Sequence, residues 1–220
     1  MIWAKPLNSS NKSNDMYISE LQHWDKVYST IAADEVSWFQ RYPKTSMAFL
    51  ELFNLPLNAN IIDIGGGDSY FADALIDKGY QNIWVLDISA KAIERAKQRL
   101  GERASKVHWI VSDITEFAPT VQFDFWHDRA AFHFLTTEDK IYKYVSIAES
   151  AIKKNGYLIL GTFSEKGPAK CSGLEVSQYS EVSMSSRFEI EFDRIKCIQE
   201  DHTTPSNAVQ HFLFCSFKKK

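Results

Sequence analysis

Cysteine is scarce in this sequence, and its distribution excludes several kinds of site. The three cysteines, Cys171, Cys197 and Cys215, form no C-x-x-C pair and no zinc-like spacing with histidine, so we expect no metal. An odd number of scattered thiols is typical of a reducing compartment, where cysteine acts as a small apolar residue. The N-terminal stretch MIWAKPLNSSNKSND lacks the apolar core of a signal peptide. These absences predict free thiols and a cytoplasmic location.

Long hydrophobic runs and a strong excess of one charge are also missing. The longest apolar runs, such as YLIL and HFLFCSF, are too short to span a bilayer. The 25 basic and 28 acidic residues leave a formal net charge of -3, which argues against a polyelectrolyte that wraps nucleic acid. We therefore expect neither a membrane nor a nucleic acid as partner.

The composition that is present is typical of a soluble globular protein, with 45% hydrophobic and 24% charged residues. A chain of 220 residues suffices for one compact domain and is tight for two. Residues 1–19 are rich in Ser, Asn and Lys and are predicted to form a flexible tail. Residues 20–59, with apolar residues at helical spacing, are predicted to form an N-terminal helical arm, and residues 60–220 the core.

From residue 60 onward, apolar strands alternate with helices. Strands are predicted over residues 60–67, 82–89, 106–115, 121–128 and 157–163, and helices over 69–80, 90–101 and 136–156. The last two predicted strands have no helix between them and should form an antiparallel pair, over residues 187–200 and 207–220. Strand–helix alternation implies right-handed crossovers and a parallel sheet covered on both faces. The sequence thus predicts an α/β fold, a Rossmann-like doubly wound sheet of seven strands with an antiparallel last strand and helices on both faces.

The segment IIDIGGGDSY carries the most information about function. Gly65, Gly66 and Gly67 follow a buried strand and precede a helix, and glycine lets the backbone turn sharply and a nucleotide-like ligand approach closely. The dinucleotide pattern G-x-G-x-x-G would require a third glycine where Tyr70 stands. A carboxylate at Asp63, two residues before Gly65, suits a cationic ligand better than a pyrophosphate.

Acids also end the next two predicted strands. Asp87 stands twenty residues after Gly67, where a carboxylate can accept hydrogen bonds from both ribose hydroxyls of an adenosine. Asp113 ends the third strand, a natural place for a contact with the adenine amine. Three consecutive strands therefore end in an acid at the edge where open parallel sheets bind ligands.

The order IIDIGGGDS, VLDIS, SDIT, FDFWHDR and NGYLILGTF resembles the class I S-adenosylmethionine-dependent methyltransferases over roughly residues 20–217. Ser69 stands where this family usually has a third glycine. The resemblance implies an enzyme with S-adenosyl-L-methionine as cofactor. It also implies the positions of the cofactor's parts: methionine beside Gly65–Gly67 and the backbone of His127, ribose on Asp87 next to Ile88, and adenine beside Asp113 and Ile114.

The aromatic segment HWDKVY…SWF resembles the cofactor-covering arm of thiopurine, thiol and some protein-lysine methyltransferases. Trp24, Tyr28 and Trp38 would then be aromatic walls near the sulfonium or the adenosine, because a cation is attracted to an aromatic face. Simple core packing by a helix stays open as the alternative for each residue.

The segment FDFWHDRAAFHFL is predicted to face the reaction. Asp128 and Arg129 are similar to the Asp-Arg pair of thiopurine methyltransferases, whose Arg lies by the substrate, and a local salt bridge is the alternative. His133 is placed to face the same cleft. Asp128, His127 and His133 are candidate bases, although a base helps only if the nucleophile arrives protonated. Cys171 is expected to have a structural or lid role.

These features together predict a methyltransferase that acts by in-line displacement on a small-molecule nucleophile, held under the arm and the loops after the fourth and fifth strands. The runner-up is a protein-lysine N-methyltransferase. A nucleotide-dependent oxidoreductase and a non-catalytic cofactor-binding module are more distant alternatives.

Overall fold

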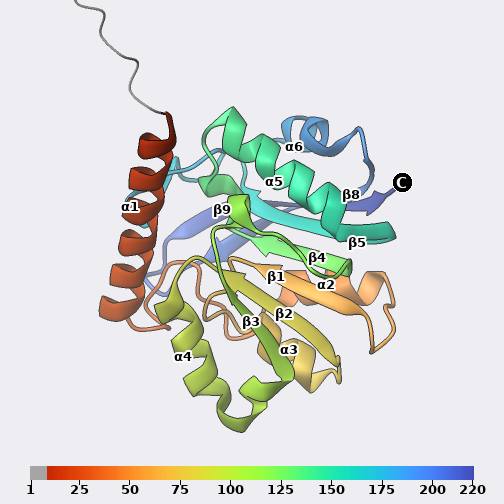
Figure 1. Ribbon diagram of the computed structural model, residues 1–220, viewed down its shortest axis with the longest axis horizontal. Helices are drawn as coiled ribbons and strands as arrows, with labels where there is room; N and C mark the ends of the chain where they lie inside the picture. Colours follow the sequence, from red (N-terminus) through yellow and green to blue (C-terminus); the bar gives the residue numbers. More distant parts are fainter. Residues whose placement is uncertain (1–8) are drawn as a thin grey trace, which may run out of the picture.

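A mixed sheet of seven strands forms the middle layer of the fold, in the order β3-β2-β1-β4-β5-β9-β8 (Figure 1). The computed structural model describes the backbone of residues 9–220 and the side chains of residues 20–220. The strands of this sheet are β1 (Asn60–Ile64), β2 (Asn82–Asp87), β3 (Val107–Val111), β4 (Phe123–Arg129), β5 (Ile152–Phe163), β8 (Phe192–Thr203) and β9 (Val209–Lys219). Two short strands, β6 (Lys170–Cys171) and β7 (Leu174–Glu175), form a separate hairpin.

The first five strands are parallel, and β9 is antiparallel to both of its neighbours, β5 and β8. This topology confirms the predicted fold class, including the antiparallel last strand. The helices are α1 (Ser9–Thr30), α2 (Lys44–Leu52), α3 (Phe71–Asp77), α4 (Ala90–Leu100), α5 (Glu138–Ala151) and α6 (Glu181–Phe188), with short 3-10 turns over Gly101–Lys106, Ile114–Glu116 and Phe132–Phe134.

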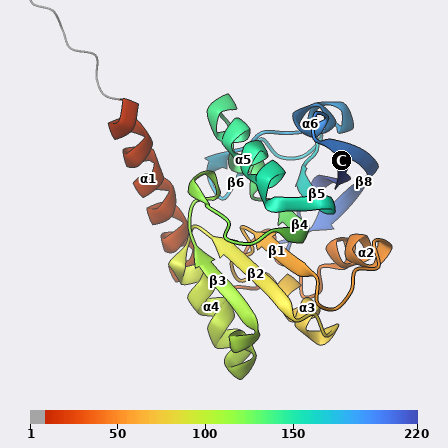
Figure 2. The same ribbon diagram turned by 45° about the vertical axis from the view of Figure 1, so that its right-hand side comes forward.

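Each face of the sheet has its own hydrophobic core because successive residues of a strand point to opposite faces. In β1, Ile62 packs into the core under α5 and α6, whereas its neighbour Ile61 packs into the core formed with α2 and α3. Figure 2 shows these helices on the two sides of the sheet. Both isoleucines are fully buried, and each such side chain contributes about 1.5–3 kcal/mol to stability. Within the described residues, no helix has the combined length and hydropathy of a bilayer span.

Helix α1 lies along one side of the sheet and begins at Ser9 (Figure 1). Residues 9–19 are therefore helical where the sequence predicted a flexible tail, and residues 1–8 of that predicted tail lie outside the described residues. The division of the chain into tail, arm and core otherwise remains a prediction.

The predicted helix over residues 136–156 is too long at its end. Helix α5 ends at Ala151, and Ile152 begins β5, where it pairs with Phe123 of β4. Ile152 fits the apolar spacing of the helix, but its burial comes from the sheet. Lys219 of β9 donates to the carbonyls of Glu149 and Ile152, which satisfies acceptors at the end of the helix.

Two of the three cysteines form a disulfide, so the prediction of free thiols is wrong for them. Cys197 on β8 lies directly opposite Cys215 on β9, and their sulfur atoms are bonded. No local sequence motif links these two cysteines, because the register of β8 against β9 brings them together. Cys171 is a free, buried thiol.

Candidate active site

The glycine turn after β1 packs tightly against its surroundings. Gly65 has a φ of +62°, and a Cβ added to it would lie 2.5 Å from Cβ of Ala131, in the loop after β4. A Cβ on Gly66 would lie 2.5 Å from Oδ2 of Asp63. A larger residue at either position would therefore force a neighbouring chain segment to move.

We expect Gly65→Ala to destabilise the protein by about 2–5 kcal/mol, since a left-handed conformation costs about 1–2 kcal/mol and overpacking about 1–3 kcal/mol. Gly173→Ala is the matched control, because Gly173 has a φ of +82° and nothing lies within 4 Å of its added Cβ. It should lose only about 1–2 kcal/mol. Urea unfolding of both variants measures the difference, and equal losses would show that the contact with Ala131 is unimportant.

A cavity of about 790 Å³, counted out to its open mouth, lies where the parallel strands end. Eight of the predicted cofactor residues line it: Trp24, Tyr28, Trp38, Gly65, Asp87, Ile88, Asp113 and Ile114. Three others, Asp63, Gly66 and His127, line a smaller neighbouring cavity, and Gly67 lines neither of these two. The structure thus brings most of the predicted cofactor residues together, and their contact with a cofactor remains a prediction.

Asp87 is the buried acid at the end of β2. Its Oδ1 accepts a hydrogen bond from the backbone N–H of Ser89 at 2.7 Å, in the turn that starts α4. Burial raises the pKa of Asp87 to about 7, although the backbone N–H groups of Ser89 and Gly67 favour its ionised form. Asp87 makes no ion pair within the described residues. Hydrogen bonds from the hydroxyl groups of a ligand would therefore stabilise its buried carboxylate.

Asp113 has a structural role whatever else it binds. Its Oδ1 accepts from the backbone N–H and the hydroxyl of Thr115, at 2.8 and 2.9 Å, and so caps the 3-10 turn over Ile114–Glu116. The prediction of a contact with adenine remains a prediction.

Asp63 belongs to a buried chain of polar groups that the sequence did not reveal. Nδ1 of His127 lies 2.7 Å from Oδ1 of Asp63 and donates to it, and Nε2 of His127 lies 2.8 Å from Oγ of Ser46. The hydroxyl of Ser69 donates to Oδ2 of Asp63 at 3.1 Å. Phe71 stacks on the His127 ring at a centroid distance of 4.1 Å. Both carboxylate oxygens of Asp63 are therefore engaged inside the protein.

Asp128 and Arg129 do not form the local salt bridge that was the alternative for them, because neighbouring strand residues point to opposite faces. The fully buried carboxylate of Asp128 accepts from the backbone N–H groups of Ala131 and Phe132, at 2.9 and 3.1 Å, and from the hydroxyl of Tyr144 at 2.8 Å. Burial raises its pKa to about 6. Asp128 thus holds the loop after β4 and lines neither described cavity. Arg129 lines both cavities.

His133 is fully buried and is absent from the walls of both cavities, so it does not face the cleft as predicted. Its Nδ1 accepts the backbone N–H of Phe163 at 3.3 Å. Burial, together with the nearby charge of Arg129, lowers the pKa of His133 to about 3. The neutral imidazole therefore packs between the loop after β4 and the end of β5.

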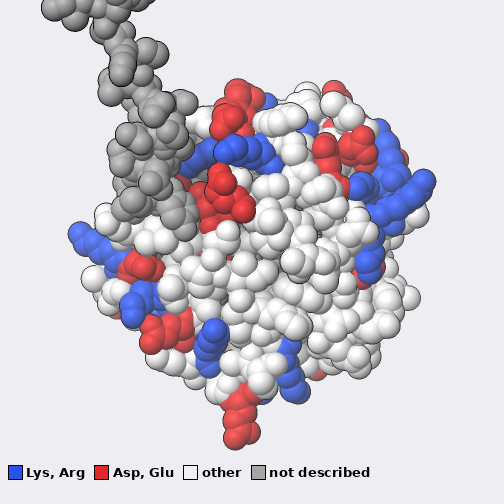
Figure 3. Space-filling view, viewed as in Figure 1, with Lys and Arg blue, Asp and Glu red and all other residues white. Residues whose placement is uncertain are grey.

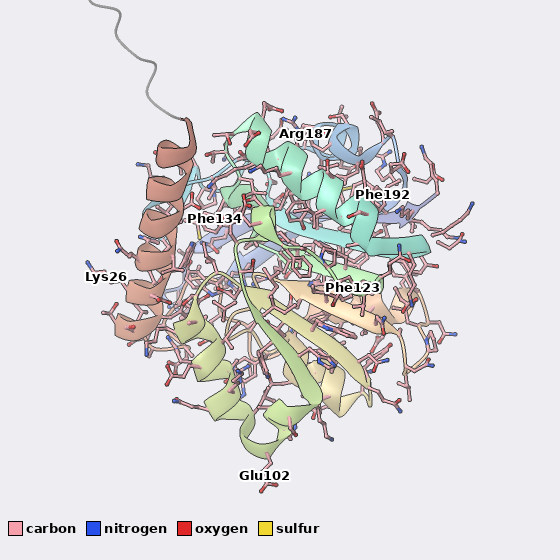
Figure 4. The ribbon with its side chains drawn as sticks, viewed as in Figure 1. Lys26, Glu102, Phe123, Phe134, Arg187 and Phe192 are labelled. Atoms are coloured by element: carbon pink, nitrogen blue, oxygen red, sulfur yellow. A yellow bond between two sulfur atoms is a disulfide. The ribbon has the colours of Figure 1, made fainter. Side chains whose placement is uncertain are left out.

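The three predicted arm aromatics pack together and also line the larger cavity. Trp24 lies 5.9 Å from Trp38 and 5.0 Å from Phe134 between ring centroids. Tyr28 lies 6.2 Å from Trp38. Figure 4 shows Phe134 on the side of the sheet that faces α1, with Phe123 at the far end of β4. Phe134 is a further wall residue that was not predicted from the sequence, although it is one of the aromatic residues that follow β4.

Contacts with α4 hold α1 over the cavity. Oδ1 of Asp25 accepts from the hydroxyl of Ser89 at 2.6 Å. The guanidinium of Arg95 donates to the carbonyl of Tyr28 at 2.9 Å. These contacts place the aromatic side chains of α1 beside the ends of β1 and β2.

Comparison with known proteins places this arrangement in a family. A family model described as "Methyltransferase domain" matches residues 57–206, more than half of the chain. The chain belongs to this methyltransferase family. The resemblance to class I S-adenosylmethionine-dependent methyltransferases is thereby confirmed, and with it the predicted enzyme class and cofactor.

Three similar proteins illustrate the range of this methyltransferase family. The chain is 29% identical to mouse EEF1A lysine methyltransferase 2 over 41% of this chain and 42% of that protein. It is 27% identical to malonyl-[acyl-carrier protein] O-methyltransferase 1 of Ilyobacter polytropus, over 49% of this chain and 39% of that protein. The alignments thus span less than half of both relatives. The crystal structure of N-methyltransferase NodS from Bradyrhizobium japonicum, in complex with S-adenosyl-l-homocysteine, superposes with a TM-score of 0.68 at 18% identity, covering 89% of this chain and 97% of that one.

Proposed function

We propose that this methyltransferase transfers a methyl group from S-adenosylmethionine to a small molecule bound under α1 and the loops after β4 and β5. The observation that carries the proposal is one cavity with two different ends. Buried acids line the end at β2 and β3, and an arginine and aromatic side chains line the end at β4.

The residues of the acidic end suit S-adenosylmethionine. The carboxylate of Asp87 would accept from the ribose hydroxyls, while the side chain of Ile114 would pack against the adenine. The close approach of Gly65 to Ala131 holds this turn in the cavity wall, where the methionine part would lie. When bound, the cofactor supplies a methyl group on a sulfonium centre, which is open to in-line displacement. The protein's own part is to align the acceptor and to exclude water from the cavity.

A protein lysine is the second candidate acceptor, because four similar proteins are named as lysine methyltransferases. Arg129 in the cavity wall disfavours this acceptor through the repulsion between its guanidinium and an ammonium group.

The mixed surface charge supports the prediction that nucleic acid is not a partner. On the face in Figure 3, acidic and basic side chains alternate around the rim. The cytoplasmic location remains a prediction. The disulfide of Cys197 and Cys215 argues against it, because disulfides are rare in the reducing cytoplasm.

Calorimetry with S-adenosylmethionine, followed by transfer of labelled methyl groups to thiols, amines, carboxylic acids and a whole-cell lysate, tests this function. We expect one cofactor to bind per chain and label to appear in a small-molecule product. Label on a protein band would favour the lysine acceptor. Failure of the folded protein to bind the cofactor would overturn the proposal.

A further inference from the structure

Arg129 has hydrogen-bonding capacity that the protein leaves unused. Its Nη1 donates to the carbonyl of Trp38 at 2.9 Å, while its buried Nε has no partner among the described residues. No carboxylate of the described residues lies within 4.0 Å of the Arg129 guanidinium, the limit for an ion pair. The carboxylate of Glu200 on β8 favours the charged form of Arg129 from a longer distance. Its guanidinium lies over the ring of Phe212, at 5.0 Å from the centroid. A poorly solvated cation with free donors is a binding site for an anion.

Arg129 lies in the cavity wall at the β4 end, which is the end proposed to hold the methyl acceptor. Asp128 pairs in register with Ile64, so Arg129 lies beside Gly65 at the sheet edge. The nearby wall is mainly apolar and includes Trp38 and Phe134, and its other polar groups are the thiol of Cys171 and the phenol of Tyr28. Burial raises the pKa of Cys171 to about 11, so this thiol is neutral. Arg129 is thus the cation in an otherwise uncharged and mainly apolar part of the wall.

The same wall offers no group suited to remove a proton from an acceptor. Neither His127 nor His133 lines the larger cavity. Glu20 is bound to Lys140 at 2.6 Å, and the pKa of the Tyr28 phenol is raised by its burial and the nearby Asp87 carboxylate. Asp87 and Asp113 lie at the end assigned to the adenosine. An alcohol or an ammonium group would therefore arrive with its proton and find no base, whereas a carboxylic acid is already ionised at neutral pH.

We infer that the acceptor is a small, mainly apolar carboxylate, held by Arg129 and methylated on its oxygen. This inference rests on the proposed methyltransferase function. A carboxylate lone pair forms the new C–O bond, the bond from methyl to sulfur breaks with its electron pair going to sulfur, and no proton moves. The products are a methyl ester and S-adenosylhomocysteine. Opposite charges cancel as the reaction proceeds, which an apolar, water-poor wall favours.

Calorimetry on the protein saturated with S-adenosylhomocysteine tests the inference with 3-phenylpropionate, its amide, 3-phenylpropylamine and 3-phenylpropane-1-thiol. We expect the carboxylate to bind at least 30-fold more tightly than the amide and the amine. With S-adenosylmethionine present, we expect mass spectrometry to detect the methyl ester. Arg129→Gln should weaken carboxylate binding at least 30-fold and leave the affinity for S-adenosylmethionine within 3-fold. Arg187→Gln, at a bidentate surface ion pair with Glu138, is the matched control and should change neither affinity.

The outcomes separate the inference from the proposed function. Equal binding of the carboxylate and the amide by the wild type, or preferential methylation of the amine or the thiol, overturns the carboxylate inference. An Arg129→Gln variant that loses cofactor affinity and keeps carboxylate affinity also overturns it, because Arg129 then holds the carboxylate of the cofactor. Failure of the wild type to bind S-adenosylmethionine overturns the methyltransferase function itself.

Discussion

Replacing Asp87 by alanine is expected to weaken binding of S-adenosylmethionine about 100-fold. Two hydrogen bonds from ribose hydroxyls to a carboxylate contribute about 1.5 kcal/mol each at the lower end of their range, and about 2.8 kcal/mol corresponds to a factor of 100 in affinity. Asp87→Asn keeps one acceptor oxygen and should lose about tenfold. Calorimetry measures both affinities, and circular dichroism checks that the variants are folded.

The affinity should also depend on pH, because burial raises the pKa of Asp87 to about 7. The ionised carboxylate accepts hydroxyl donors and the protonated acid accepts them poorly. Cofactor binding should therefore tighten as the pH rises through about 7 and level off above it, and Asp87→Asn should remove this dependence. The carboxylates of Asp63 and Asp68 add to the raised pKa, while the N–H groups of Ser89 and Gly67 oppose it.

The same raised pKa predicts the opposite trend for the stability of the unliganded protein. Below the ordinary pKa of an aspartate, Asp87 carries the proton in both the folded and the unfolded chain. Its ionisation then does not change the free energy of unfolding. Between that value and about 7, the folded state holds a proton that the unfolded state has lost, so stability falls as the pH rises. Unfolding measured from pH 5 to 8 should show this decline in the wild type and less of it in Asp87→Asn.

Unchanged affinity of a folded Asp87→Ala variant for S-adenosylmethionine would contradict the role of Asp87 in ribose binding.

Replacing Asp63 by alanine is expected to destabilise the fold by about 3–5 kcal/mol. The variant leaves the imidazole of His127 and the hydroxyl of Ser69 without their acceptor in a buried site, and breaking such a network by removing one partner is costly. The loss should be large because the chain of contacts joins β1, β4 and, through Ser46, helix α2. Chemical denaturation measures it.

Asp77→Ala is the matched control for this prediction. Asp77 also contacts the side chain of a basic residue, Arg103 at 2.6 Å, but both groups lie at the surface. Its loss should cost less than about 1 kcal/mol. A double variant, Asp63→Ala with His127→Leu, should be less destabilised than the sum of its single variants, because it leaves no unpaired imidazole. Additive losses would show that the two side chains act independently.

The sequence predicted the parts of this site that depend on order along the chain. Asp87 and Asp113 each follow an apolar run, so their arrival at one edge of a parallel sheet could be read from the strand pattern. The strand pattern also predicts Asp63 at the end of β1, but it does not predict which side chains the Asp63 carboxylate contacts. Ser46 comes from α2, and no local pattern shows that its hydroxyl meets His127.

Other errors have the same origin. The end of α5 was misplaced because Ile152 satisfies the helical spacing equally well, and only its pairing with Phe123 decides between helix and strand. The disulfide of Cys197 and Cys215 depends on the register of β8 against β9. His133 was expected in the cleft from its spacing after Arg129, yet the 3-10 turn over Phe132–Phe134 places it in the interior instead.

The order of strands leaves β3 and β8 as the two edges of the sheet, where unpaired backbone groups can recruit a strand of another molecule. The β3 edge is only five residues long. The β8 edge is longer, and charged side chains interrupt it at Asp193, Arg194, Lys196, Glu200 and Asp201. Short length protects one border and charge protects the other, so copies of this chain are discouraged from joining sheet to sheet.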